Sequence, residues 1–194
     1  ATLGWNTRDP YLKKFYPTSV LVTGFDIIFF WVARMIMFGM EFIKKEPFKD
    51  IYVHALVRDE KGQKMSKSKG NVIDPLDLIE KYSADALRFT LLSMASPGHD
   101  VKLSEERVKG YRNFLNKIWN ANNFLSQNKC DFGDVKKPEN IKLTINKWIL
   151  SELVKVKNDT ENSLKNYRFD EAAKIIYQFV WHSFCDWYLE LSKT

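Results

Sequence analysis

Residues 19–37, which read SVLVTGFDIIFFWVARMIM, decide how the first part of the chain folds. Ser19 to Thr23 are mostly β-branched and apolar, and Gly24 follows them, which predicts a buried strand that ends in a tight turn. From Asp26 to about Met40 apolar side chains occur nearly all round, which is the composition of a helix buried on most of its faces. The stretch therefore predicts a strand that leads directly into a helix.

A second strand is predicted after Pro47, at residues 51–57, which read IYVHALV. A polar loop flanked by glycines follows from Arg58 to Asn71. Strand, helix and strand form one βαβ unit, in which the first helical turn directs backbone N–H groups at the carboxyl end of the strand. Ligands bind at this edge in open α/β sheets.

The rest of the chain has a helical period. Asp74-Pro75 and Ser83 are predicted to cap two short helices that end before Ser96-Pro97-Gly98. Beyond them we expect no further strand, but three long helices, the first capped by Ser104 and the last two antiparallel and joined near residues 166–169. Their apolar stripes are Val108, Tyr111, Leu115, Ile118 and Trp119; Ile145, Trp148, Ile149, Leu153 and Val156; and Ile176, Phe179, Val180, Phe184, Trp187 and Leu191.

Composition excludes several classes of protein. Lys and Arg (30) exceed Asp and Glu (24), and the formal charge of +6 is a mild excess that suits a polyanionic partner without requiring one. Cys130 and Cys185 lie far apart, so neither a disulfide framework nor a zinc site is indicated. Residues 20–43 contain three charges and are read as a core element, not a membrane span. Residues 1–9 lack the features of a signal peptide, and the start without methionine suggests an excerpt from a longer protein.

The loop contains a motif that can carry chemistry. Residues 64–68 read Lys-Met-Ser-Lys-Ser, with Gly62 before them and Gly70 after them. Two ammonium groups on a mobile loop can close on a triphosphate, where they stabilise the charge that develops when pyrophosphate leaves. Taken without context, a run of Lys and Ser of this size is far more often a solvated basic loop.

These residues match, letter for letter, the Lys-Met-Ser-Lys-Ser motif of the class I aminoacyl-tRNA synthetases, and they follow the last predicted strand of the nucleotide fold as in that family. The similarity covers essentially the whole chain and is greatest to the valine-specific members. It is carried also by residues 16–35, 57–62, 85–89, 169–173 and 184–189.

The resemblance implies an α/β remnant of a Rossmann-like nucleotide-binding fold followed by a mostly α-helical bundle. Residues 1–60 would be the C-terminal part of the catalytic domain, residues 61–103 the lysine loop and connecting helices, and residues 104–194 a partial α-helical anticodon-binding domain. The implied reaction is ATP-dependent activation of valine and its ligation to tRNA. The implied partners are tRNA, valine and ATP, with Mg²⁺ carried by ATP, no protein metal site, no membrane, a monomeric parent enzyme and a cytoplasmic location.

The family motifs also imply roles for individual residues. Lys64 and Lys67 would be catalytic. ATP would be bound by Lys67, Lys64, Ser66, Gly24, Asp26, His54 and Val57. Ile27 and Trp31, one helical turn apart, would line the amino-acid pocket. The ordinary alternatives are that Ile27 and Trp31 are plain core and that His54 is a satisfied histidine at a strand end.

Departures from the family leave other interpretations open. Ala55 and Ser83 stand where the family usually has glycine, and Ala55 could alter the fit of the nucleotide. The family's His-Ile-Gly-His motif does not occur here, so we expect the chain alone to be an incomplete and inactive part of the enzyme. The alternatives are a non-catalytic tRNA-binding module derived from such an enzyme, or the same chemistry with isoleucine or leucine.

Overall fold

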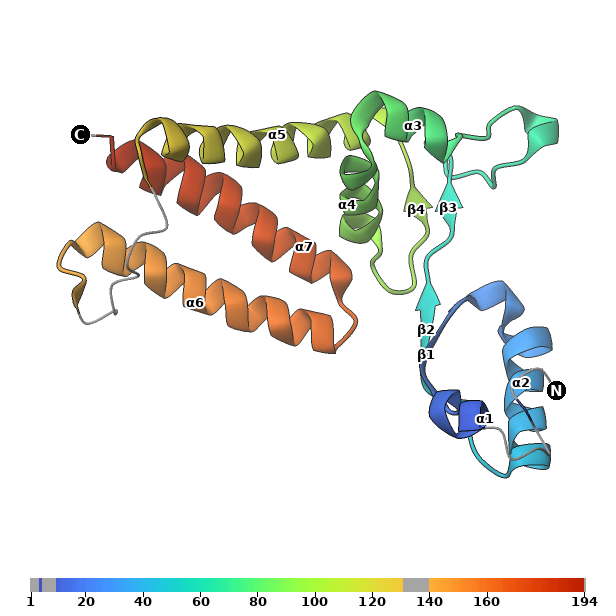
Figure 1. Cartoon of the computed structure of the whole chain (residues 1–194). Coiled ribbons are helices and arrows are strands. Elements are labelled where there is room, and N and C mark those ends of the chain that lie inside the picture. Colours follow the sequence, from blue (N-terminus) through green and yellow to red (C-terminus); the bar gives the residue numbers. More distant parts are fainter. Residues whose placement is uncertain (1–3, 5–9, 131–139, 194) are drawn as a thin grey trace. The chain divides into compact units, whose positions relative to one another are not determined.

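The computed structural model describes residue 4, residues 10–130 and residues 140–193 (Figure 1). The chain divides into two compact units, Ala1–Leu56 and Val57–Thr194. Among the described residues no helix is long and apolar enough to cross a membrane.

The first unit contains a two-stranded parallel sheet. Strand β1 (Thr18–Gly24) pairs with β2 (Phe48–His54) from Thr18 opposite Phe48 to Gly24 opposite His54. A helical run connects the strands, which confirms the predicted βαβ unit. The run consists of η1 (Phe25–Ile27), η2 (Ile28–Val32), α2 (Ala33–Phe38) and η3 (Gly39–Ile43), and α1 (Pro10–Phe15) precedes β1.

The second strand does not have its predicted limits. β2 begins at Phe48, three residues earlier than expected, and ends at His54. Val57 instead opens β3 (Val57–Arg58), because the ladder breaks at residues 55–56. The apolar run at residues 51–57 therefore belongs to two strands.

The prediction that the helix after β1 is buried on most of its faces was wrong. Val32 and Gly39 are buried, whereas Phe29, Met37 and Phe38 are 89%, 67% and 61% exposed. The cause is the small size of the first unit, in which the sheet formed by β1 and β2 has two strands and is too narrow to cover most faces of the run. The run is also irregular, since η2 and η3 are π-helical and η1 is a 3₁₀ turn.

The second unit is built on a core beside the loop. Helices α3 (Pro75–Tyr82), α4 (Ala84–Met94) and α5 (Glu105–Gln127) surround it. The predicted caps are confirmed, since the side chains of Asp74, Ser83 and Ser104 accept hydrogen bonds from N–H groups in the first turns. The buried members of this core are Leu78, Tyr82, Ala86, Leu87, Leu103 and Val108.

A short strand that the sequence analysis did not expect also lies in this unit. Val101–Lys102 form β4, which pairs in parallel with β3. The N–H of Leu103 continues the contact by donating to the carbonyl of Arg58 (3.0 Å). The expectation that no strand follows the two short helices was wrong, because two residues are too few to show a period of two.

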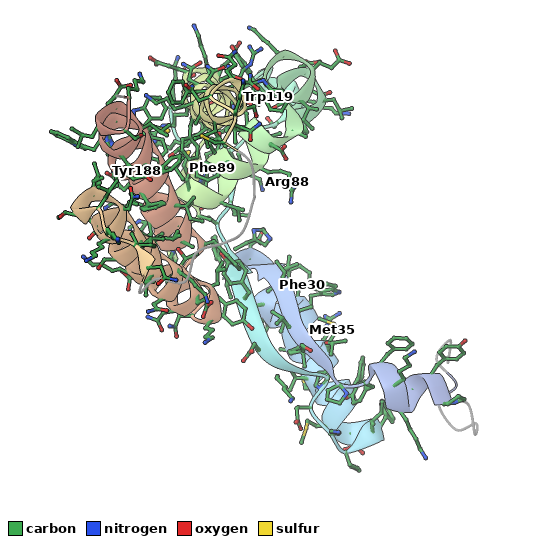
Figure 2. All side chains as sticks on the ribbon, turned by 60° about the vertical axis from the view of Figure 1, so that its left-hand side comes forward. Phe30, Met35, Arg88, Phe89, Trp119 and Tyr188 are labelled. Carbon is green, nitrogen blue, oxygen red and sulfur yellow. The ribbon has the colours of Figure 1, made fainter. Side chains whose placement is uncertain are left out.

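The predicted long helices are present. α6 (Thr144–Lys165) leads through residues 166–168 into α7 (Phe169–Gln178), which continues as the π-helix η6 (Phe179–Leu189). α6 and α7 lie side by side, as the short connection predicts (Figure 1). Phe89 of α4 points into the bundle and packs against Phe114 of α5 with the two rings tilted by 45°, whereas Arg88 points outward (Figure 2).

Candidate functional site

The carboxyl ends of β1 and β2 bring together three of the predicted nucleotide-binding residues. Gly24 and His54 are partners in the last register position of the parallel ladder. Gly24 is buried, and a Cβ built on it would lie 2.7 Å from Asp26 Oδ1 and 3.7 Å from His54 Cε1. Only a glycine leaves the Asp26 carboxylate this close to the backbone at the strand end. At the strand end the Asp26 carboxylate and the His54 imidazole therefore lie beside the backbone of Gly24, which has no side chain.

The imidazole of His54 has a defined partner. Its Nδ1 lies 2.9 Å from the carbonyl oxygen of Ala55, and because a carbonyl only accepts, Nδ1 donates this hydrogen bond. In the neutral ring Nε2 is then the acceptor. The ring is exposed, so this nitrogen can meet a ligand.

The residues predicted for the amino-acid pocket follow in the helical run. Ile27 is half-buried, and Trp31 is 45% exposed. The prediction placed both residues on one face of a regular α-helical turn. The structure has no such turn here, because Ile27 ends the 3₁₀ turn η1 and Trp31 lies in the π-helical η2. Both residues nevertheless come directly after the strand-end group of Gly24 and Asp26.

The remaining predicted residues lie in the second unit. Val57 is 41% exposed and opens β3. Lys64 and Lys67 are exposed, and among the described residues neither ammonium group forms an ion pair. Lys67 begins the 3₁₀ turn η4 (Lys67–Lys69), which ends at Gly70 with φ of 65°, a conformation that favours glycine. The two charges are therefore available to an anion.

Met65 attaches the lysine loop to the core. Met65 is half-buried and packs, together with Ile73, against the core beside α3 and α4. Met65 points into the core, whereas Lys64 and Lys67 stay in solvent. This arrangement fixes which side of the loop faces the solvent. Ser66 is half-buried, and its Oγ lies 3.2 Å from Oγ of Ser68.

Two polar side chains that the sequence analysis did not single out hold this loop. Oδ1 of Asn71 accepts from the N–H of Ser66 (2.9 Å), and Nδ2 of Asn71 donates to Oδ2 of Asp59 (2.8 Å). The Asn71 hydrogen bond, followed by one from the N–H of Gln63, holds the pKa of Asp59 below its usual range. Asp and Asn at the two ends of a glycine-flanked loop were a signal that could have identified them.

The structure thus describes the predicted residues in two groups. Gly24, Asp26, Ile27, Trp31 and His54 belong to the first unit, whereas Val57, Lys64, Ser66 and Lys67 belong to the second. Within the described ranges, no group of three or more His, Cys, Asp and Glu side chains is arranged to hold a metal ion.

Comparisons with known proteins agree over the whole chain. A family model described as tRNA synthetases class I (I, L, M and V) matches residues 1–104, and a model described as the anticodon-binding domain of tRNA ligase matches residues 146–194. A valine–tRNA ligase of Pelagibacter ubique is 77% identical over 194 residues, which are 100% of this chain and 22% of that protein. The valine–tRNA ligase of Bartonella quintana is 56% identical over 193 residues, 100% of this chain and 21% of that protein. The chain spans about a fifth of the length of these curated relatives.

Solved structures share the fold. A ternary complex of Agrobacterium radiobacter LeuRS with tRNA and LeuAMS matches with a TM-score of 0.75 and 21% identity, over 86% of this chain and 22% of that one. The Mycobacterium tuberculosis methionyl-tRNA synthetase in complex with methionyl-adenylate matches with a TM-score of 0.72 and 22% identity, over 89% of this chain and 34% of that one. The predicted fold, an α/β remnant of a Rossmann-like nucleotide-binding fold followed by a mostly helical bundle, is confirmed.

Proposed function

Since the chain belongs to the class I tRNA synthetases, the family of the isoleucine, leucine, methionine and valine enzymes, we propose that the protein containing it activates valine with ATP and ligates it to tRNA. Its relatives at 77% and 56% identity are valine–tRNA ligases, which supports valine as the amino acid. The observation that carries the proposal is the loop of residues 64–68, which presents two exposed lysines on a base anchored by Met65.

Activation requires a change of bonds at the α-phosphorus of ATP. A carboxylate oxygen of valine attacks this phosphorus, the bond to the bridging oxygen breaks, and pyrophosphate leaves as valyl-adenylate forms. Charge grows on the departing oxygens, so cations placed beside them stabilise the transition state more than the ground state. We assign this work to Lys67, with Lys64 assisting. Mg²⁺ arrives with ATP as part of the substrate.

The strand-end group is assigned to the nucleoside. Gly24 leaves room for close approach of the ribose, and the Asp26 carboxylate can accept hydrogen bonds from ribose hydroxyls. His54 and Val57 are assigned to the adenine. For the amino acid, Ile27 and Trp31 are the proposed pocket residues.

In the second step a terminal hydroxyl of tRNA attacks the carbonyl carbon of valyl-adenylate, and AMP leaves. The match of residues 146–194 to an anticodon-binding domain supports tRNA as the partner of the helical part. The division into residues 1–60, 61–103 and 104–194 stays a prediction, as do a monomeric parent enzyme and a cytoplasmic location.

Amino-acid-dependent ATP–pyrophosphate exchange by the full-length protein tests the proposal, with valine, isoleucine, leucine and methionine compared at equal concentrations. We expect exchange to be fastest with valine. Faster exchange with isoleucine or leucine would assign a different amino acid. Binding of tRNA without exchange for any of the four would show that the protein is a non-catalytic module.

A further inference from the structure

Asn71 holds the lysine loop from outside the motif itself. Its Oδ1 accepts from the N–H of Ser66 (2.9 Å), and its Nδ2 lies 3.3 Å from the carbonyl oxygen of Lys64, to which it donates. The Asn71 amide is therefore hydrogen-bonded to the backbone on both sides of Met65, at Lys64 and at Ser66. Since Met65 is anchored in the core, the side chain of Asn71 fixes the stretch from which both lysines project.

Asp59 holds Asn71 in turn. Its Oδ2 accepts from Nδ2 of Asn71 (2.8 Å), and its Oδ1 accepts from the N–H of Gln63 (2.6 Å). The backbone of residues 59–63 closes a tight turn, because the N–H of Asp59 donates to the carbonyl of Gln63 (3.1 Å). One carboxylate thus joins the start of the loop to its end.

We propose that Asn71 and Asp59 are positioning residues for adenylate formation, because together they hold the backbone of Lys64 and Ser66 so that the ammonium groups of Lys64 and Lys67 meet the leaving pyrophosphate. This inference rests on the proposed function. Neither residue touches the reacting atoms in this role. Hydrogen bonds that fix the loop backbone reduce the ordering that the loop must undergo on the way to the transition state.

The predicted kinetic effect follows from this role. Lysines that meet the developing charge act on the transition state, so loosening them lowers kcat of activation more than it raises KM for ATP. A displacement of about 1 Å at a reacting group costs roughly a hundredfold in rate. We therefore expect Asn71→Ala to lower kcat by about 10- to 100-fold, with KM for ATP changed by less than about threefold.

The full-length protein and its variants test this in valine-dependent ATP–pyrophosphate exchange. Asn166→Ala is the matched control, because Asn166 also donates from Nδ2 to a backbone carbonyl, that of Asn162 (2.8 Å), at a helix end remote from the motif. We expect wild-type kcat from this control. In a background of Lys64→Ala with Lys67→Ala, Asn71→Ala should add little further loss, because both groups that it positions are gone. A loss from Asn71→Ala in this background as large as its loss in the wild type would overturn the inference.

An exchange of the two side chains sharpens the test. Asn71→Asp alone places two carboxylates at a hydrogen-bond distance from each other. In Asp59→Asn alone, the side chain at position 59 keeps one acceptor oxygen for two donors, the N–H of Gln63 and Nδ2 of Asn71, so one of them loses its acceptor. The double variant Asp59→Asn with Asn71→Asp restores an amide–carboxylate pair and keeps an acceptor for the N–H of Ser66. We expect each single variant to be slow and the double variant to recover most of the lost kcat, although the Lys64 carbonyl loses its donor. A double variant as slow as the product of the single effects would overturn the proposal.

Hydrogen–deuterium exchange of the peptide covering residues 59–71 gives a readout that does not depend on activity. The amide of Ser66 should exchange faster in Asn71→Ala than in the wild type and in Asn166→Ala. Faster hydrogen–deuterium exchange with unchanged kcat, or unchanged hydrogen–deuterium exchange, would overturn the positioning role and leave the proposed function in place. A wild-type protein without amino-acid-dependent exchange would overturn the proposed function, and the positioning role with it.

Discussion

The hydroxyl of Ser83 accepts a hydrogen bond from the N–H of Ala86 (3.3 Å), although the backbone of Ser83 has φ of 89° and ψ of 152°. This region of backbone conformation is essentially restricted to glycine, and a residue with a Cβ held there costs about 1–3 kcal/mol. Ser83 stands where the resembling family usually has glycine. The chain therefore combines a favourable cap with an unfavourable backbone at the junction of α3 and α4.

Ser83→Gly is expected to raise the free energy of unfolding by about 1 kcal/mol. Relief of strain outweighs the loss of the cap, because glycine at an N-cap costs only a few tenths of a kcal/mol, and outweighs the added flexibility of the unfolded chain, roughly 0.5–1 kcal/mol. Ser83→Ala keeps the strain and loses the cap, so it should lower stability by about 1 kcal/mol. Urea unfolding followed by far-UV circular dichroism measures both.

Ser104 provides the control for this prediction. It caps α5 from extended backbone with φ of −128°, so Ser104→Gly relieves no strain and should destabilise the chain. If the two glycine substitutions changed stability in the same direction, strain at Ser83 would not be the cause.

Gly24→Ala is expected to raise KM for ATP by about tenfold in the full-length protein, because a lost hydrogen bond to a charged group costs about 1.5–3 kcal/mol and each 1.4 kcal/mol is about tenfold in affinity. The added Cβ would lie 2.7 Å from Asp26 Oδ1, closer than real Cβ atoms approach, so the carboxylate assigned to the ribose must move. KM and kcat from ATP–pyrophosphate exchange measure the effect. Gly110→Ala in α5 is the control, because its added Cβ meets nothing within 4 Å, and alanine is the better helix former. A KM for Gly24→Ala equal to that of the control would contradict the assignment.

Local features of the sequence predicted most elements of the fold. Asp74-Pro75 and Ser104 identify helix starts because the capping side chain and the capped N–H are neighbours in the chain. Helical stripes predicted α5, α6 and α7 for the same reason. β4 has only two residues and depends on a partner, β3, that lies more than forty residues earlier in the chain. No local pattern indicates such a pair.

Burial and site geometry were less predictable. Apolar composition indicated that the run after Gly24 needs partners, but it does not say whether the unit supplies them, and Phe29 is 89% exposed. The lysines were named through a family motif, and their roles stay predictions. The hydrogen bond between Asp59 and Asn71 joins residues that are twelve positions apart in the chain. The only signal for it in the sequence is the presence of polar residues at both ends of the loop.

Lys67→Ala is expected to slow valine-dependent activation by about 10²- to 10³-fold, the loss typical when one group that stabilises developing charge is removed. Valine affinity, measured by equilibrium binding to the full-length protein, should stay within about twofold, because the lysine acts on the phosphates. Lys69→Ala is the matched control, since Lys69 lies in the same 3₁₀ turn, is exposed and has no assigned role. Equal rates for the two variants would remove the role assigned to Lys67.

The last prediction concerns acid stability. Arg168 donates from Nε and Nη2 to the carboxylate of Asp170 (both 3.1 Å), and Ser96 donates to it (3.0 Å), which ties the end of α4 to α7. The Arg168 hydrogen bonds, followed by that of Ser96, lower the pKa of Asp170 from its ordinary value of 3.8. The folded state therefore holds the charged carboxylate more strongly than the unfolded state does. The resulting stability is complete above the ordinary pKa and is lost as the pH falls through the lower folded value.

We expect Asp170→Asn to lower Tm at pH 7, and the difference from the wild type to shrink as the pH falls from about 4 towards 2, where the wild-type carboxylate is also neutral. Thermal unfolding at a series of pH values measures this difference. Asp159→Asn, at an exposed position of α6, should follow the wild-type curve throughout. A constant gap between Asp170→Asn and the wild type at every pH would mean that the amide lowers stability through packing, and that the charge of Asp170 does not contribute.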